Sequence, residues 1–264
     1  MEWISNSIEL IKSRIMEGKK VNKQELMENG IPLLYAAQIE WAVDTLNTKI
    51  EFRRKGIFIV ISGIDKSGKE TQAFKGGENI KPISAFLKEH GYSVMDIIQP
   101  SYDTILGSMV KWYLDSGSLN REDAWILWVL DRAQHNQKIA NWLSNGGIVL
   151  AKRWTESNIV YQAVQGVNVD AILTTERNIV KQDVTFVLDV NLSEVLRRMN
   201  GKGDYYENTR MLNQVMENYL KLRSSYKYGT IVYVDANGSP QEVNRTLLSI
   251  VKDYLDANLG NPQI

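Results

Sequence analysis

The sequence predicts an α/β fold with a five-stranded parallel sheet covered by helices on both faces, preceded by a helical hairpin. Short apolar runs rich in β-branched residues alternate with longer amphipathic stretches, as strands and crossover helices do in parallel sheets. A glycine-bounded loop follows the first apolar run, which is the context of a phosphate-binding loop. The expected strands are residues 57–61, 92–98, 148–151, 184–188 and 231–234.

Length and composition limit the class of protein. The 264 residues suffice for one α/β domain and an additional segment. The 31 basic and 31 acidic residues balance, so we expect neither nucleic acid nor a membrane as partner. Cysteine is absent, which excludes disulfides and thiol catalysis. No apolar run approaches the roughly 20 residues of a membrane span, and the start of the chain lacks the pattern of a secretion signal. We expect a soluble, cytoplasmic protein.

Residues 1–55 are expected to form an N-terminal helical extension in front of a kinase-sized domain, residues 56–264. Two apolar stripes with helical spacing predict a hairpin. The sequence leaves three roles of this hairpin open: packing on the main domain, a dimer contact, or a cover over the active site. The stripes are Trp3, Ile4, Ile8, Ile11 and Ile15, then Ile39, Val43, Leu46 and Ile50.

The remaining helices are predicted from apolar periodicity and from the glycines and prolines that end it. The helix after the glycine loop is expected to break at Gly76-Gly77 and to resume through Ile83 until Gly91. One long helix is expected over 121–143. The others are expected at 104–116, 157–166, around 196–198, at 211–226 and at 239–255.

The stretch Gly63–Thr71 has the composition of a phosphate-binding loop. Its glycines let the backbone approach an anion, and the loop and helix amides point at phosphate oxygens. Lys69 is placed to reach the outer phosphates. The usual Ser or Thr after this lysine is replaced by Glu70, and Thr71 offers the next hydroxyl. A plain glycine turn with a surface lysine is the alternative, but the strand before the loop and the helix after it favour phosphate binding.

Four motifs in one order resemble the thymidylate kinase family across roughly residues 57–256. They are Gly63–Gln72, Leu130–His135, the group Arg153-Trp154, Ser157-Asn158 and Tyr161-Gln162, and Thr185–Val190 before a helix with paired arginines. The resemblance implies a three-layer P-loop kinase fold and phosphoryl transfer from ATP to a deoxynucleoside monophosphate, expected to be dTMP. It also implies Mg²⁺ and a homodimer.

The resemblance implies roles for the substrate-binding residues. Trp128 matches the aromatic residue that stacks on thymine, and Arg132 and Arg153 match the two arginines that grip the monophosphate. Asp65 matches the carboxylate near the 3′-hydroxyl. Without the resemblance, Trp128 would be a core residue, Asp65 a turn residue and Arg132 a surface ion-pair partner. The positions around the base and sugar are Ser157, Asn158, Tyr161 and Gln162.

The resemblance also implies the groups that act on the phosphates. The family places an extra catalytic cation either in the loop, which is here Lys66, or as an arginine in a lid. The lid candidate, residues 201–207, offers Lys202 and Asp204 but no arginine, so we favour Lys66. Catalysis is assigned to Lys66, Lys69, Arg132 and Arg153, and metal binding to Thr71 and Asp189. The ATP-binding set is Gly63, Lys66, Ser67, Gly68, Lys69, Glu70 and Thr71.

Three positions depart from the family pattern and leave other functions open. Lys152 stands where the family has an aspartate, Gln99 or Tyr102 stands where it has an arginine, and Glu70 replaces the loop hydroxyl. One alternative is a nucleotide-binding or regulatory protein without catalysis. Another is a deoxynucleoside kinase, which needs a general base; Asp103 is a weak candidate for that role.

Overall fold

The computed structural model describes residues 1, 3–199 and 209–259, and its chain forms two compact units. The sheet unit consists of Arg53–Ile98, Asn141–Ser157 and Lys181–Ile264; the helical unit consists of Met1–Phe52, Gln99–Ala140 and Asn158–Val180. The chain passes between them after Phe52, Ile98, Ala140, Ser157 and Val180, so that α7 (Asn136–Ser144) and α8 (Thr155–Val164) each belong to both units. A domain boundary after residue 55 stays a prediction.

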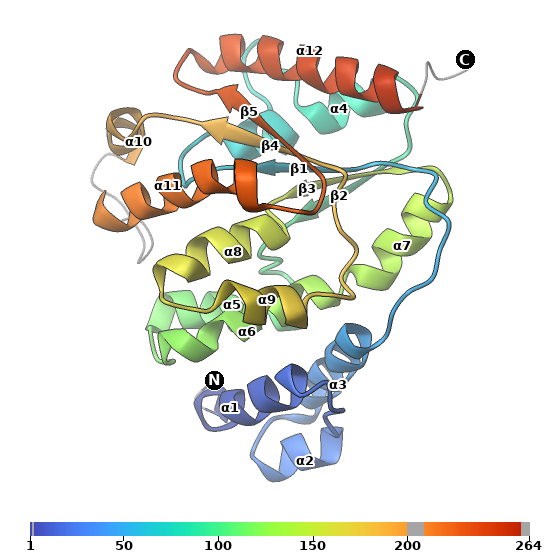
Figure 1. Cartoon of the computed structure of the whole chain (residues 1–264), viewed down its shortest axis with the longest axis vertical. Helices are drawn as coiled ribbons and strands as arrows, with labels where there is room; N and C mark the ends of the chain where they lie inside the picture. The colour runs from blue at the N-terminus through green and yellow to red at the C-terminus, as the bar shows by residue number, and fades with distance from the viewer. Residues whose placement is uncertain (2, 200–208, 260–264) are drawn as a thin grey trace. The chain divides into compact units, whose positions relative to one another are not determined.

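The sheet unit contains one parallel sheet with the strand order β2-β3-β1-β4-β5 (Figure 1). This confirms the predicted five-stranded parallel sheet. The buried β1 is central, and later strands lie on both sides of it. The loop after β1 therefore begins at a topological switch point, where open α/β sheets bind ligands. The strands are β1 (Phe58–Ser62), β2 (Val94–Ile98), β3 (Ile148–Lys152), β4 (Val184–Asp189) and β5 (Thr230–Asp235).

One face of the sheet is covered by α11 (Thr209–Ser225). Ser62 is in register with Val187, and Val187 is in register with Tyr233, so these three side chains share a face. Tyr219 of α11 reaches this face, because its hydroxyl lies 2.9 Å from the Ser62 Oγ.

The other face is covered by α12 (Pro240–Leu259). Ile61 is in register with Lys152 on one side and with Phe186 on the other. The ring of Phe186 meets Tyr254 of α12 edge-on at 6.2 Å. Lys152 therefore projects from the face that α12 covers, which matters for the site described below.

The helix after the glycine loop breaks as predicted. It is a short π-helix, η1 (Thr71–Lys75), that ends at Gly76, whose φ of 65° is positive. A Cβ at Gly76 would lie 2.7 Å from the carbonyl oxygen of Ile80, so no other residue fits this turn. The chain resumes as α4 (Ile83–Glu89), and α10 spans Leu192–Met199.

The helical unit is built around α6 (Arg121–Ala133), whose apolar face is buried. The N-terminal helices α1 and α3 pack on α6 within this unit, and Lys12 of α1 forms an ion pair with Asp123. Ile4, Ile8, Ile11 and Ile15 of the predicted stripe are buried. The other helices are α1 (Trp3–Met16), α2 (Lys23–Glu28), α3 (Leu33–Asn47), α5 (Ile105–Ser116) and α9 (Val169–Thr175).

The predicted single helix over 121–143 is wrong, because α6 ends at Ala133 and α7 begins at Asn136. The break is fixed by contacts with a distant loop. The Gln134 Nε2 donates to the Thr104 Oγ1 at 3.0 Å, and a ring nitrogen of His135 lies 2.9 Å from the Ser101 Oγ. Such tertiary contacts leave no mark on apolar periodicity.

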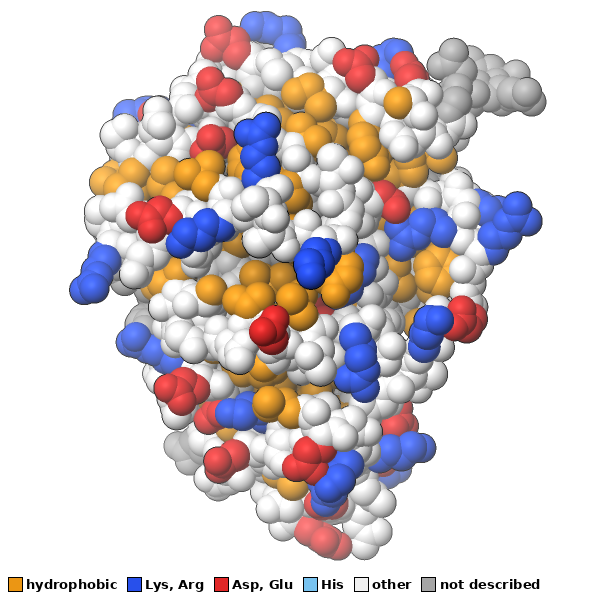
Figure 2. Space-filling view, viewed as in Figure 1, with side chains coloured by type: hydrophobic (Ala, Val, Ile, Leu, Met, Phe, Trp, Pro, Cys, Tyr) orange, Lys and Arg blue, Asp and Glu red, His pale blue; other side chains and the backbone are white. Residues whose placement is uncertain are grey.

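Charges of both signs are interspersed on the face of the molecule displayed in Figure 2. None of the helices in the described part of the chain combines the length and the apolar character needed to cross a membrane.

Candidate active site

The glycine loop of the sheet unit has the backbone of an anion site. Gly63 has φ 131°, and a Cβ there would lie 2.7 Å from the Leu188 carbonyl oxygen and 2.9 Å from the Ser67 Oγ. Gly68 has φ 95° with open space where a Cβ would lie. Lys66 is left-handed without being glycine, with φ 59°. Such strained residues cluster at functional sites.

Arg198 supports this strained loop. Its Nη1 donates to the Lys66 carbonyl oxygen at 3.1 Å, and its Nη2 donates to the Ala236 carbonyl oxygen at 3.0 Å. The arginine thus ties the loop to the end of β5. The sequence predicts a helix at Arg198 but does not indicate this contact.

Lys69 lies folded into the loop and is only 7 % exposed. Its Nζ donates to the Ile64 carbonyl oxygen at 2.5 Å and lies 3.4 Å from the Ser67 Oγ. Burial lowers the pKa of Lys69 well below its usual value, with a further lowering from Arg153, while Asp65 acts in the opposite direction. An anion at this ammonium group would raise the pKa again.

Arg153 and Asp65 meet beside the loop. Arg153 directly follows β3, its amide donates to the Ile61 carbonyl oxygen at 3.1 Å, and its φ of 64° is left-handed. This backbone directs the side chain to Asp65, with which its Nη2 forms an ion pair. The structure therefore brings together Lys66, Lys69 and Arg153, which were expected at the phosphates, with Asp65, which was expected near the 3′-hydroxyl of the substrate.

Glu70 lies between two lysines. The Lys152 Nζ is 3.0 Å from its Oε2, and the Lys75 Nζ is 2.7 Å from its Oε1. These hydrogen bonds, first that of Lys75 and then that of Lys152, lower the pKa of Glu70 to about 2. The carboxylate is therefore ionised at all ordinary pH values.

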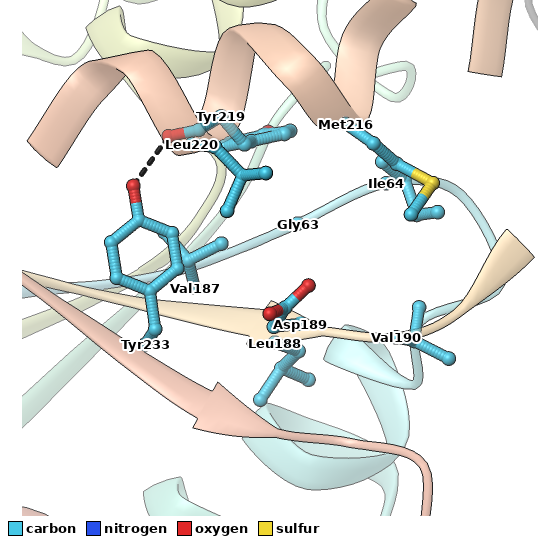
Figure 3. A pocket seen from close by; sticks show the side chains of 10 residues that line it. All are labelled: Gly63, Ile64, Val187, Leu188, Asp189, Val190, Met216, Tyr219, Leu220 and Tyr233. Atoms are coloured by element: carbon cyan, nitrogen blue, oxygen red, sulfur yellow. Dashed lines mark hydrogen bonds between the residues drawn. The ribbon is translucent and has the colours of Figure 1, made fainter. Parts of the chain in front are cut away.

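The two residues expected to bind metal lie at different points of the sheet unit. Thr71 begins η1, and Asp189 ends β4. Figure 3 shows Asp189 at a small hollow beside Gly63, its carboxylate projecting on the side of α11. Among the described residues, no three His, Asp or Glu side chains are grouped to hold a metal ion. A shared metal between Thr71 and Asp189 stays a prediction.

A buried polar cluster lies where β1 meets α8. The Glu156 carboxylate, fully buried, accepts hydrogen bonds from the Ser62 hydroxyl at 2.8 Å and the Ser157 hydroxyl at 2.9 Å. The Tyr219 hydroxyl lies 3.0 Å from the Ser157 Oγ. Ser157, expected near the substrate, is thus engaged in this cluster, and neither Glu156 nor Tyr219 is among the residues that the sequence predicts for the site.

In the helical unit, α6 carries Trp128 and Arg132. Trp128 is half-buried and meets Tyr113 edge-on at 5.7 Å. Arg132 is almost fully buried, and its Nε and Nη2 both donate to the Glu176 Oε1, the former at 2.9 Å. The Nη1 forms no hydrogen bond with any residue in the described ranges. The Asn158 Nδ2 donates to the same carboxylate oxygen at 3.1 Å.

Glu176 is thus the centre of a buried cluster that the sequence does not predict. It lies just after α9 in the polar run Thr174-Thr175-Glu176-Arg177, which resembles a surface turn. No local signal distinguishes it. Tyr161 and Gln162 are buried in the same unit. Lys202 and Asp204 of the expected lid lie outside the described residues.

Asp131 is buried beside Arg132 and accepts two hydrogen bonds. The donors are the Ser101 amide, 3.0 Å from Oδ2, and the Gln134 Nε2, 2.6 Å from Oδ1. Burial nevertheless dominates and raises the pKa of Asp131 to about 7. It therefore titrates near neutral pH.

Comparison with known proteins shows the family to which the chain is similar. The family model described as Thymidylate kinase matches residues 61–247. A protein of Thermococcus gammatolerans named probable thymidylate kinase is 29 % identical over 213 residues, covering 76 % of this chain and 98 % of the relative. Another protein of that name, from Staphylothermus marinus, is 32 % identical over 204 residues, covering 76 % of this chain and 96 % of the relative.

Among solved structures, a thymidylate kinase of Candida albicans superposes with a TM-score of 0.64 at 23 % identity, covering 79 % of this chain and 95 % of its own. This likeness supports the fold. The family model covers well over half of the chain and includes the glycine loop, Arg132 and Arg153. The chain therefore belongs to the thymidylate kinase family.

Proposed function

We propose that this protein transfers the γ-phosphoryl group of ATP to dTMP and forms dTDP and ADP. The observation that carries the proposal is the burial of Lys69 in a glycine loop that has residues with positive φ and lies at the switch point of the sheet. Its relatives are named thymidylate kinases, and phosphoryl transfer needs the cationic cradle that this loop offers.

The sheet unit supplies the groups for the phosphates. Phosphoryl transfer depends on positioning and on stabilising charge at the transferred group rather than on covalent steps. Lys69 and Lys66 neutralise the outer phosphates of ATP. Arg153, oriented by Asp65, donates to the phosphoryl oxygens. The loop amides complete the anion site.

The helical unit supplies the groups proposed for the monophosphate. Trp128 presents part of an apolar ring for stacking on the base. Arg132 binds the 5′-phosphate through Nη1, since Nε and Nη2 are held by Glu176. Asn158, Tyr161 and Gln162 are the other proposed contacts, as the family pattern implies.

The residues of the sheet unit fit ATP with Mg²⁺. Mg²⁺ with nucleotides is held by one or two protein oxygens together with phosphates and water, so the site needs no group of three carboxylates. Thr71 and Asp189 are the proposed protein oxygens. When bound, Mg²⁺ neutralises charge on the transferring phosphoryl group.

The test is an assay of acceptors. The purified protein is incubated with ATP, Mg²⁺ and a panel of nucleosides and nucleoside monophosphates, and the products are separated by chromatography. We expect dTDP from dTMP and loss of that product in Lys69→Met. Lys88→Met is the matched control, because Lys88 forms an exposed ion pair with Asp96 in the same unit.

The alternatives predict different products. Phosphorylation of thymidine but not of dTMP would indicate a deoxynucleoside kinase. ATP binding without any product would indicate a nucleotide-binding protein without catalysis. Either result would overturn the proposal.

A further inference from the structure

The charge pattern around Glu70 is not explained by the proposed function. In the phosphate-loop motif, the residue after the lysine supplies a hydroxyl to Mg²⁺, and Glu70 occupies that position. Both of its carboxylate oxygens are occupied by lysine ammonium groups, Lys152 on Oε2 and Lys75 on Oε1. Glu70 is therefore arranged as a counter-ion rather than as a metal ligand.

The fold places Lys152 at the loop. Lys152 ends β3 in register with Ile61, one residue before β1 ends. The next residue, Arg153, pairs with Asp65, while Lys152 pairs with Glu70. The consecutive residues Lys152 and Arg153 thus form ion pairs with two carboxylates of the glycine loop. The Lys152 side chain is 17 % exposed, and its charge acts on the nearby Lys69.

We infer that Lys152 is a further phosphate-binding lysine beside Lys66 and Lys69, held in place by Glu70 until nucleotide binds, and that its charge adds to that of Mg²⁺ at the phosphates. The inference rests on the proposed assignment of the loop to ATP. The Nζ of Lys152 moves from the Glu70 Oε2 to a phosphate oxygen. Lys75 stays on Oε1, so the carboxylate keeps a counter-ion.

Two consequences follow from this arrangement. First, nucleotide binding depends on Lys152 most strongly when Mg²⁺ is absent, because Mg²⁺ then no longer shares the neutralisation of the phosphates with the lysines and Arg153. Second, Glu70 competes with the phosphate for Lys152. Removal of the Glu70 charge therefore strengthens nucleotide binding, whereas removal of a metal ligand would weaken binding of the Mg²⁺–nucleotide complex.

The experiment measures ADP binding by isothermal titration calorimetry with the full chain, once in excess EDTA and once in Mg²⁺. ADP binding involves no turnover, so the result is independent of whether dTMP is phosphorylated. In EDTA we expect Lys152→Met to weaken ADP binding by about tenfold to a hundredfold, the range of a charge-assisted hydrogen bond. In Mg²⁺ the loss is smaller. Lys152→Arg restores binding, and Lys88→Met changes neither value.

Glu70→Gln provides the second arm and keeps the shape of the side chain. We expect it to bind ADP more tightly than the wild type in EDTA and no more weakly in Mg²⁺. Circular dichroism checks that each variant is folded; should Lys152→Met not fold, Glu70→Gln still decides. Unchanged ADP binding in Lys152→Met, or weaker Mg²⁺–ADP binding in Glu70→Gln, would overturn the inference. So would a wild type that binds no ADP in either buffer.

Discussion

The buried ion pair of the helical unit gives a quantitative prediction for stability. Glu176 is fully buried, and its Oε1 accepts hydrogen bonds from the Arg132 Nε, the Arg132 Nη2 and the Asn158 Nδ2. Replacing Glu176 by leucine leaves the Arg132 guanidinium buried without its counter-charge. Breaking a buried pair on one side costs about 3–5 kcal/mol, a large part of the 5–15 kcal/mol that stabilises a typical domain.

The double variant separates the pair from its surroundings. Arg132→Met alone leaves the Glu176 carboxylate uncompensated and is expected to cost about 3–5 kcal/mol as well. Arg132→Met with Glu176→Leu removes both charges, and we expect it to cost less than either single change. The assay is urea unfolding at pH 7, followed by far-UV circular dichroism, with the four proteins forming a double-mutant cycle.

An exposed pair in the same unit serves as control. Lys111 and Asp115 lie one helical turn apart, 2.8 Å between Nζ and Oδ2, and both side chains are more than half exposed. Asp115→Ala is therefore expected to cost less than about 1 kcal/mol. The argument from the buried charge would be refuted if the losses of stability in Arg132→Met and Glu176→Leu added up in the double variant. It would also be refuted if each single loss were as small as that of Asp115→Ala.

Two further predictions concern pH and the loop. Because burial raises the pKa of Asp131 to about 7, the folded state keeps a proton that the unfolded state loses above its ordinary pKa. The free energy of unfolding of the wild type therefore falls by up to about 4 kcal/mol from pH 4 to pH 7. In urea titrations, Asp131→Asn should not show this contribution. A fall in the variant as large as that in the wild type would contradict the prediction. Gly63→Ala places a methyl group 2.7 Å from the Leu188 carbonyl oxygen and should weaken ADP binding at least about tenfold. An unchanged affinity for ADP in isothermal titration calorimetry would contradict this prediction.

The strands and the glycine loop could be predicted because their signals are local. The apolar run before Gly63 and the glycines of the loop are contiguous in sequence. Their order along the chain, together with the rules for parallel sheets, predicts that the loop lies at the carboxyl edge. The break at Gly76 was predicted for the same reason, since glycine itself gives the signal.

The interactions that orient the site residues could not be predicted in the same way. Glu176 meets Arg132 across 44 positions of sequence, and Glu70 meets Lys152 across 82. Each pair depends on which helix or strand ends at which place. The same holds for the break between α6 and α7, which depends on contacts of Gln134 with a distant loop. Burial of a charge is set by tertiary packing, and a polar residue in a turn carries no sign of it.

The central claim is that this chain moves the γ-phosphoryl group of ATP to dTMP through the loop that holds Lys69. The most direct measurement uses ATP labelled in its γ-phosphoryl group together with dTMP, and follows the label. We predict that the label appears in dTDP with the wild-type protein and not with Lys69→Met. Label that remains in ATP, or that is released only as inorganic phosphate, would contradict the claim.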